Sequence, residues 1–159
     1  MAIRCYIPTT LSALRSGLGA VHAVAPNSAG RDSGGEELEA QEFDALCIAA
    51  ALAAAQSFDS TADGQSKDFI EAPVRAVAAY DAPTSTAAEQ LTSGFDLLSI
   101  DEVDPTSIVS FHVDEPHVWE AAVTIAAEGG REAAEDHLGD SDLLWYDVTE
   151  LDQLLEERG

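Results

Sequence analysis

Two segments of the chain alternate apolar and polar residues strictly enough to predict strands with one buried face. The first is 3–7, where the apolar residues Ile3, Cys5 and Ile7 share one face of the predicted strand. The second is 107–113, which has the strongest strand pattern in the sequence. Four further segments show shorter strand patterns: 20–25, 74–80, 95–100 and 143–148. We expect 95–100 to lie at an edge of the sheet, and 81–93 fits neither a strand nor a helix clearly.

One segment, 36–57, has the length and apolar spacing of a long helix, with three glutamates in its first turn. Its apolar residues form two adjacent stripes. The first contains Leu38, Ala45, Leu46, Ala49, Leu52 and Ala53, and the second contains Phe43, Cys47, Ala50 and Ala54. Almost nothing polar occurs between Asp44 and Gln56. We therefore expect this half of the helix to be covered nearly all round.

Shorter helices are predicted at 11–16 and at 115–128. A further short helix is predicted to end at Leu138, and a last one to follow Thr149. Asp114 is placed to cap the helix of 115–128, because a carboxylate accepts a bond from an otherwise unpaired backbone N–H. Strands that alternate with helices predict an α/β fold of the α+β sandwich kind. We expect about five strands in a mixed sheet, with helices mainly on one face, ferredoxin-like in style.

The length of 159 residues predicts a single domain over 1–159. Two polar stretches without apolar anchors, near 27–35 and 59–68, predict mobile loops. The most apolar run is about ten residues long, which is too short to cross a bilayer. The start of the chain has no basic segment followed by a long apolar one, as a secretory signal would have. We expect a cytoplasmic protein whose two cysteines stay reduced.

The charge is strongly one-sided, with 30 acidic and 7 basic residues and a net charge of −23. Direct binding to a nucleic-acid backbone is excluded, because that affinity comes from Lys and Arg. Attraction to an anionic membrane is excluded for the same reason. The acidic residues are scattered, and several have local roles at helix starts. We expect a protein as the partner, and the sequence leaves the oligomeric state open.

Three stretches resemble a known family: 6–11 (YIPTTL), 111–114 (FHVD), and 143–146 (LLWY) with 150–151 (EL). In this order and at these separations they are similar to short acidic actinobacterial proteins of unknown function. The resemblance implies a cytoplasmic actinobacterial protein. It implies no activity and no catalytic residue.

Motifs for catalysis are missing from the sequence. There is no phosphate-binding glycine loop and no Gly-x-Ser-x-Gly elbow. Residues 112–117 hold two histidines and two carboxylates, but Asp114 and Pro116 fit a helix start and the spacing matches no established metal site. We predict no catalytic residue, no metal and no cofactor, and the sequence leans against an enzyme.

One polar cluster is a candidate ligand-binding site. If the first, the strongest and the last strands are neighbours, four polar residues share a sheet face with one of two aromatic residues. The candidate residues are Arg4, Tyr6, Ser110 and His112, with either Trp145 or Tyr146, and Asp114 beside them. Such a surface suits an anion or a peptide carboxylate. In the alternative interpretation Tyr6 and Trp145 are core aromatics and Arg4 pairs with a carboxylate.

These features support four interpretations of function. The favoured one is a non-catalytic binding or regulatory protein whose acidic surface meets a protein partner. The second is a small-molecule or anion-binding module, or a small enzyme, that uses the polar sheet face. The third is a nucleic-acid mimic, which needs a dense one-sided stripe of carboxylates. In the fourth, the acidity only keeps the protein soluble.

Overall fold

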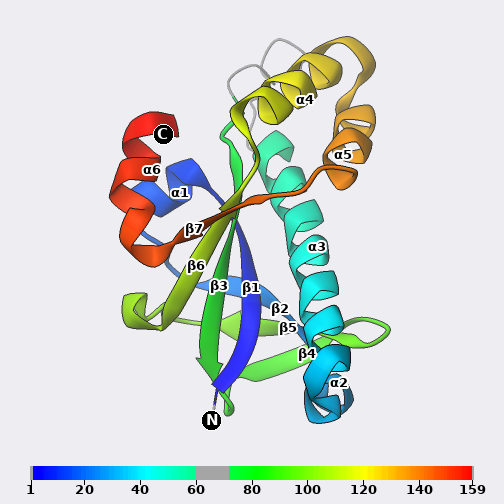
Figure 1. Ribbon diagram of the computed structural model, residues 1–159, viewed down its shortest axis with the longest axis vertical. Helices are drawn as coiled ribbons and strands as arrows, with labels where there is room; N and C mark the ends of the chain where they lie inside the picture. Colours follow the sequence, from blue (N-terminus) through cyan, green and yellow to red (C-terminus); the bar gives the residue numbers. More distant parts are fainter. Residues whose placement is uncertain (1, 60–71, 159) are drawn as a thin grey trace.

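Seven strands form one antiparallel sheet in the computed structural model of the protein, which describes residues 2–59 and 72–158 (Figure 1). The strands are β1 (Ala2–Thr10), β2 (Val21–Pro26), β3 (Arg75–Pro83), β4 (Ala87–Thr92), β5 (Phe95–Ile100), β6 (Ile108–Val113) and β7 (Leu144–Asp147). Their order across the sheet is β4-β5-β2-β1-β3-β6-β7, and every neighbouring pair is antiparallel.

The predicted mixed sheet of about five strands is therefore wrong, although the general α/β class is confirmed. The sequence pattern missed β4, because its residues are mostly exposed and few of them are β-branched. A tight turn at Gly94, where φ is +87°, returns the chain into β5. β5 lies between β4 and β2, so the prediction of 95–100 as an edge strand is also wrong.

Helices cover both faces of the sheet (Figure 1). The helices are α1 (Leu11–Ser16), α2 (Ser28–Ser33), α3 (Gly35–Asp59), α4 (Pro116–Gly129), α5 (Arg131–Gly139) and α6 (Leu151–Arg158), with short 3-10 turns at Pro105–Ser107 and Val148–Glu150. Successive residues of β1 divide the core. Cys5 and Ile7 pack with Leu11 of α1 and Leu154 of α6, whereas Tyr6 packs under α3 on the opposite face. The predicted ferredoxin-like arrangement, with helices mainly on one face, is corrected by this second layer.

Beyond the end of the sheet, α4 and α5 pack against the second half of α3 (Figure 1). Phe58 of α3 and Trp119 of α4 are stacked there, with ring centroids 5.7 Å apart. Pro116 opens α4, as expected, but Asp114 does not cap it, because its carboxylate is bonded to Arg75. Within the described residues no helix is long and apolar enough to span a membrane.

The two predicted loops have different outcomes. In 27–35 the chain forms α2 and enters α3, and the Asn27 side chain accepts a bond from the N–H of buried Gly30. The mobility predicted for this segment stays a prediction. Apart from Asp59, the loop predicted at 59–68 lies outside the described residues.

Candidate functional site

Two adjoining cavities lie along α3. The larger has a volume of about 560 Å³ and lies between α3, α5 and the segment 141–143. The smaller has a volume of about 310 Å³ and lies between the first half of α3 and the sheet face formed by β1, β6 and β7. Phe43 and Leu46 line both cavities, so the two lie next to each other beside the helix.

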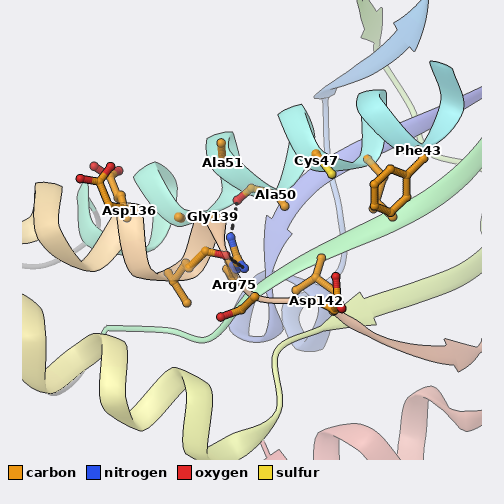
Figure 2. Close-up of a pocket in the computed structure, with 14 residues that line it drawn as sticks. Phe43, Cys47, Ala50, Ala51, Arg75, Asp136, Gly139 and Asp142 are labelled. Atoms are coloured by element: carbon orange, nitrogen blue, oxygen red, sulfur yellow. Dashed lines mark hydrogen bonds between the residues drawn. The ribbon is translucent and has the colours of Figure 1, made fainter. Parts of the chain in front are cut away.

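The apolar stripes of α3 explain why the larger cavity exists. The first stripe is buried against the sheet, where Ala45, Ala49 and Ala53 are fully covered. The second stripe lines the larger cavity (Figure 2), and its Ala50 and Ala54 are buried whereas its first two residues are not. Phe43 is 58% exposed, and Cys47 is exposed as well. The sequence predicts a cover nearly all round this half of α3, and the described part of the chain leaves the Phe43–Cys47 side open.

Carboxylates surround the apolar part of the larger cavity. Glu135 and Asp136 of α5 line it, and Asp142 lies on the segment that faces α3 (Figure 2). Asp136 and Asp142 are exposed to solvent. The cavity thus combines an apolar floor with a negatively charged rim, which suits a ligand that is both apolar and cationic.

Arg75 lies at the inner end of the larger cavity and is 2% exposed. Its Nε and Nη2 donate to the two carboxylate oxygens of Asp114, at 2.6 and 2.9 Å. Nη1 donates to the carbonyl of Ala50 in α3, and Nη2 also donates to the carbonyl of Leu138 in α5. Arg158 donates to the backbone carbonyl of Asp114. Through Arg75 and Arg158, Asp114 therefore links β3, α3, α5 and α6. It lines neither cavity.

The smaller cavity gathers five of the seven candidate residues predicted from sequence. They are Arg4, Tyr6, Ser110, His112 and Trp145. Strand register brings them together, because Tyr6 is opposite Ala79 in β3 and Ala79 is opposite Ser110 in β6. His112 in turn is opposite Trp145 in β7.

Register also decides between the two aromatic candidates. Trp145 lies on the α3 side of the sheet, whereas Tyr146 pairs with Phe111 and packs in the core under α1 and α6. Trp145 is 60% exposed, so it is not a core residue, whereas Tyr6 is buried.

The positive charge of Arg4 is compensated in place. Its Nε donates to Asp81 at 2.7 Å, which is the pairing with a carboxylate considered as the alternative for this residue. The ion pair with Asp81 raises the pKa of Arg4. His112 shares a 3.1 Å hydrogen bond with Ser110, and burial lowers the pKa of the imidazole. Both effects reduce the attraction of this face for an anion.

Two carboxylates that the sequence reasoning missed also line the smaller cavity, Glu39 and Glu42 of α3. Burial raises the pKa of Glu42. Burial, reinforced by the nearby Glu42, raises the pKa of Tyr6 to about 12, so the phenol stays neutral. With Arg4 paired, the cavity carries net negative charge and favours a cation over an anion. In the sequence, the only indication of these carboxylates was the acidic start of the long predicted helix.

The thiols are poor nucleophiles. Cys5 is fully buried, and desolvation raises its pKa to about 12. Cys47 lines the larger cavity, where partial burial and the neighbouring Asp44 and Asp142 raise its pKa. Neither thiol forms the reactive thiolate readily near neutral pH. In 2–59 and 72–158, no group of three or more His, Cys, Asp or Glu side chains gathers as metal ligands.

Comparisons with known proteins give one match. A family of unknown function, DUF6912, matches residues 3–155. No curated protein and no solved structure matches the chain.

Proposed function

We propose that this chain, which belongs to the DUF6912 family of unknown function, is a non-catalytic binding protein that holds a basic, apolar segment of a partner protein along α3. The observation that carries the proposal is the open apolar stripe of α3 above a cavity of about 560 Å³ with an acidic rim. A cytoplasmic, actinobacterial setting is part of the proposal and is supported by the motif resemblance and by the excess of arginine over lysine.

The proposal that the partner segment is apolar rests on the exposed apolar side chains that line the larger cavity. Phe43 leaves more than half of its side chain in water, and Leu46, Ala51 and Leu143 line the same cavity. Covering a side chain of this size gains about 1.5–3 kcal/mol when burial is complete. A partner that lays apolar residues against this side of α3 gains that energy and supplies the cover the sequence pattern requires.

The length of the open stripe indicates the form of the occupant. The exposed residues on this side, Phe43, Cys47 and Ala51, span about two turns of α3, or roughly 12 Å. An amphipathic helix that lies in a groove presents apolar residues at matching intervals over this length. A helical segment of a partner is therefore a better match than a single small molecule for the whole stripe.

Charge selects a basic partner. Asp136 and Asp142 line the larger cavity and are exposed, so they are available to the basic flank of a docked segment. Glu135 is instead paired with Arg131 at 3.4 Å. The net charge of −23 extends the attraction beyond the cavity and speeds encounter with a cation. Because exposed charges are screened within about 8 Å at physiological ionic strength, the association weakens as salt rises.

The test uses a synthetic peptide with leucine on one helical face and lysine on the other, and fluorescence anisotropy measures its binding. We expect binding at low salt, weaker binding at high salt, and no binding of the same peptide with glutamate in place of lysine. Ala51 lines the larger cavity, so Ala51→Trp fills it and is expected to weaken binding at least about tenfold.

Ala40 is an exposed alanine of the same helix outside both cavities, so Ala40→Trp is the matched control and is expected to leave the affinity unchanged. The proposal fails if the lysine peptide does not bind at low salt. It also fails if Ala51→Trp binds the peptide as tightly as Ala40→Trp does.

A further inference from the structure

Three aromatic side chains and two carboxylates line the smaller cavity together. The aromatic residues come from different elements, Tyr6 from β1, Phe43 from α3 and Trp145 from β7. The carboxylates are Glu39 and Glu42 of α3. We propose that this cavity is a binding site for a quaternary ammonium group.

The aromatic residues supply the surface that such a cation prefers. The face of an aromatic ring attracts a cation, and Trp is the strongest of the three ring types. Tyr6 is nearly covered, whereas Phe43 is 58% and Trp145 60% exposed. Two large aromatic groups thus stand uncovered beside a buried third one. The methyl groups of a quaternary ammonium are apolar, so they can pack against such rings while the positive charge stays close to them.

The carboxylates supply the charge. Arg4 is held by Asp81 through bonds of 2.7 and 3.4 Å, which leaves its charge compensated. Among the described residues neither Glu39 nor Glu42 forms an ion pair, although the nearby Arg4 acts on Glu42 and opposes the effect of burial on its pKa. His112 is bonded to Ser110, and its burial favours the neutral imidazole. Within the described residues, the cavity therefore has two carboxylates that form no ion pair beside three aromatic side chains.

This combination favours a quaternary ammonium over a metal ion. A metal ion needs several converging ligands, and within 2–59 and 72–158 no group of three or more His, Cys, Asp or Glu is found. A quaternary ammonium has no N–H group that needs a hydrogen-bond acceptor, and it carries apolar methyl groups. The volume of about 310 Å³ is at the small end of the range for small-molecule sites.

The inference does not rest on the proposed partner segment, because Tyr6, Glu42 and Trp145 line only the smaller cavity. Ala51, which tests the partner segment, lines only the larger one. The two proposals can therefore fail separately.

Choline is the probe, and tryptophan fluorescence reports its binding. Of the two tryptophans, Trp119 is 6% exposed and stacked on Phe58, so a probe in solution reaches Trp145 first. We expect a saturable change in emission with choline. The neutral isostere 3,3-dimethylbutan-1-ol is expected to bind at least about fivefold more weakly, because it lacks the charge.

Glu42→Gln removes one carboxylate and leaves the fluorescent reporter in place. We expect it to weaken choline binding at least about threefold. The control is Glu36→Gln, which changes an exposed glutamate of the same helix outside the cavity and is expected to have no effect. Calorimetry with Trp145→Ala, checked for folding by circular dichroism, is expected to show weaker binding.

A parallel titration with a peptide that contains trimethyl-lysine identifies the source of the group, since the free cation and the side chain carry the same chemistry. Saturable binding of either probe with the stated loss in Glu42→Gln supports the site. The inference is overturned if neither probe saturates, if the neutral isostere binds as tightly as choline, or if Glu36→Gln and Glu42→Gln behave alike.

Discussion

Replacing Asp114 by asparagine tests whether the buried pair with Arg75 holds the larger cavity together. Both side chains are nearly inaccessible, at 2% for the whole of Arg75 and 0% for Asp114. The substitution keeps the size of the side chain but removes the charge that compensates the guanidinium. Leaving one charge of a buried pair unpaired costs about 3–5 kcal/mol.

The expected shift in melting temperature follows from the size of the chain. At about 2–4 °C for each kcal/mol in a protein of this length, Asp114→Asn lowers the melting temperature by roughly 6–20 °C. Circular dichroism during heating and urea unfolding measure the change. Hydrogen exchange should quicken around Ala50 and Leu138, because Arg75 also bonds their carbonyls.

A second ion pair in the same sheet is the matched comparison. Arg4 and Asp81 have side chains that are 39% and 36% exposed, so Asp81→Asn is expected to cost at most about 1 kcal/mol. The double variant Arg75→Met/Asp114→Leu should recover much of the stability lost in Asp114→Asn, because no charge is then left buried alone. If Asp114→Asn costs no more than Asp81→Asn, the structural role given to Asp114 is wrong.

Three further outcomes follow from the same structure. Burial lowers the pKa of His112 below the ordinary value, which is near 6.5, so the unfolded chain takes up a proton first as the pH falls. Its contribution to stability is therefore full above about pH 6.5 and declines below that, and urea unfolding of His112→Gln should show a weaker pH dependence than that of the unaltered protein. Iodoacetamide should modify Cys47 slowly near neutral pH and faster at alkaline pH, and leave Cys5 unmodified in the folded protein, because Cys5 is buried with a pKa of about 12. Mass spectrometry that finds Cys5 modified first would contradict that picture. Trp119→Ala removes the ring that is stacked on Phe58 and should cost about 3–5 kcal/mol in urea unfolding, and a cost below about 1 kcal/mol would mean that α4 is held mainly by other contacts.

The sequence predicts a helix or strand well where its apolar residues recur at the spacing that places them on one buried face. The strand predicted at 107–113 and the short helix predicted at 11–16 are both found in the structure. β4 was missed because an exposed edge strand has no buried face to leave such a pattern. The covering of the second sheet face by α1 and α6 depends on long-range packing, which local periodicity does not report.

The candidate site was likewise predicted only where local alternation was informative. The parity of Tyr6, Ser110 and His112 within their strands was enough to place them on one face once the strands are neighbours. Glu39 and Glu42 were missed because the sequence does not say which side of α3 meets the sheet. Asp114 was expected at a helix start, and only the fold brings it to Arg75, 39 positions earlier in the chain.

The central claim, a basic and apolar partner segment along α3, is tested most directly at Cys47, which lies in the open stripe itself. The measurement is the rate of Cys47 alkylation at alkaline pH with and without the leucine–lysine peptide. We predict that peptide at a concentration that just saturates the unaltered protein slows alkylation there and slows it clearly less in Ala51→Trp. An alkylation rate that saturating peptide leaves unchanged would contradict it.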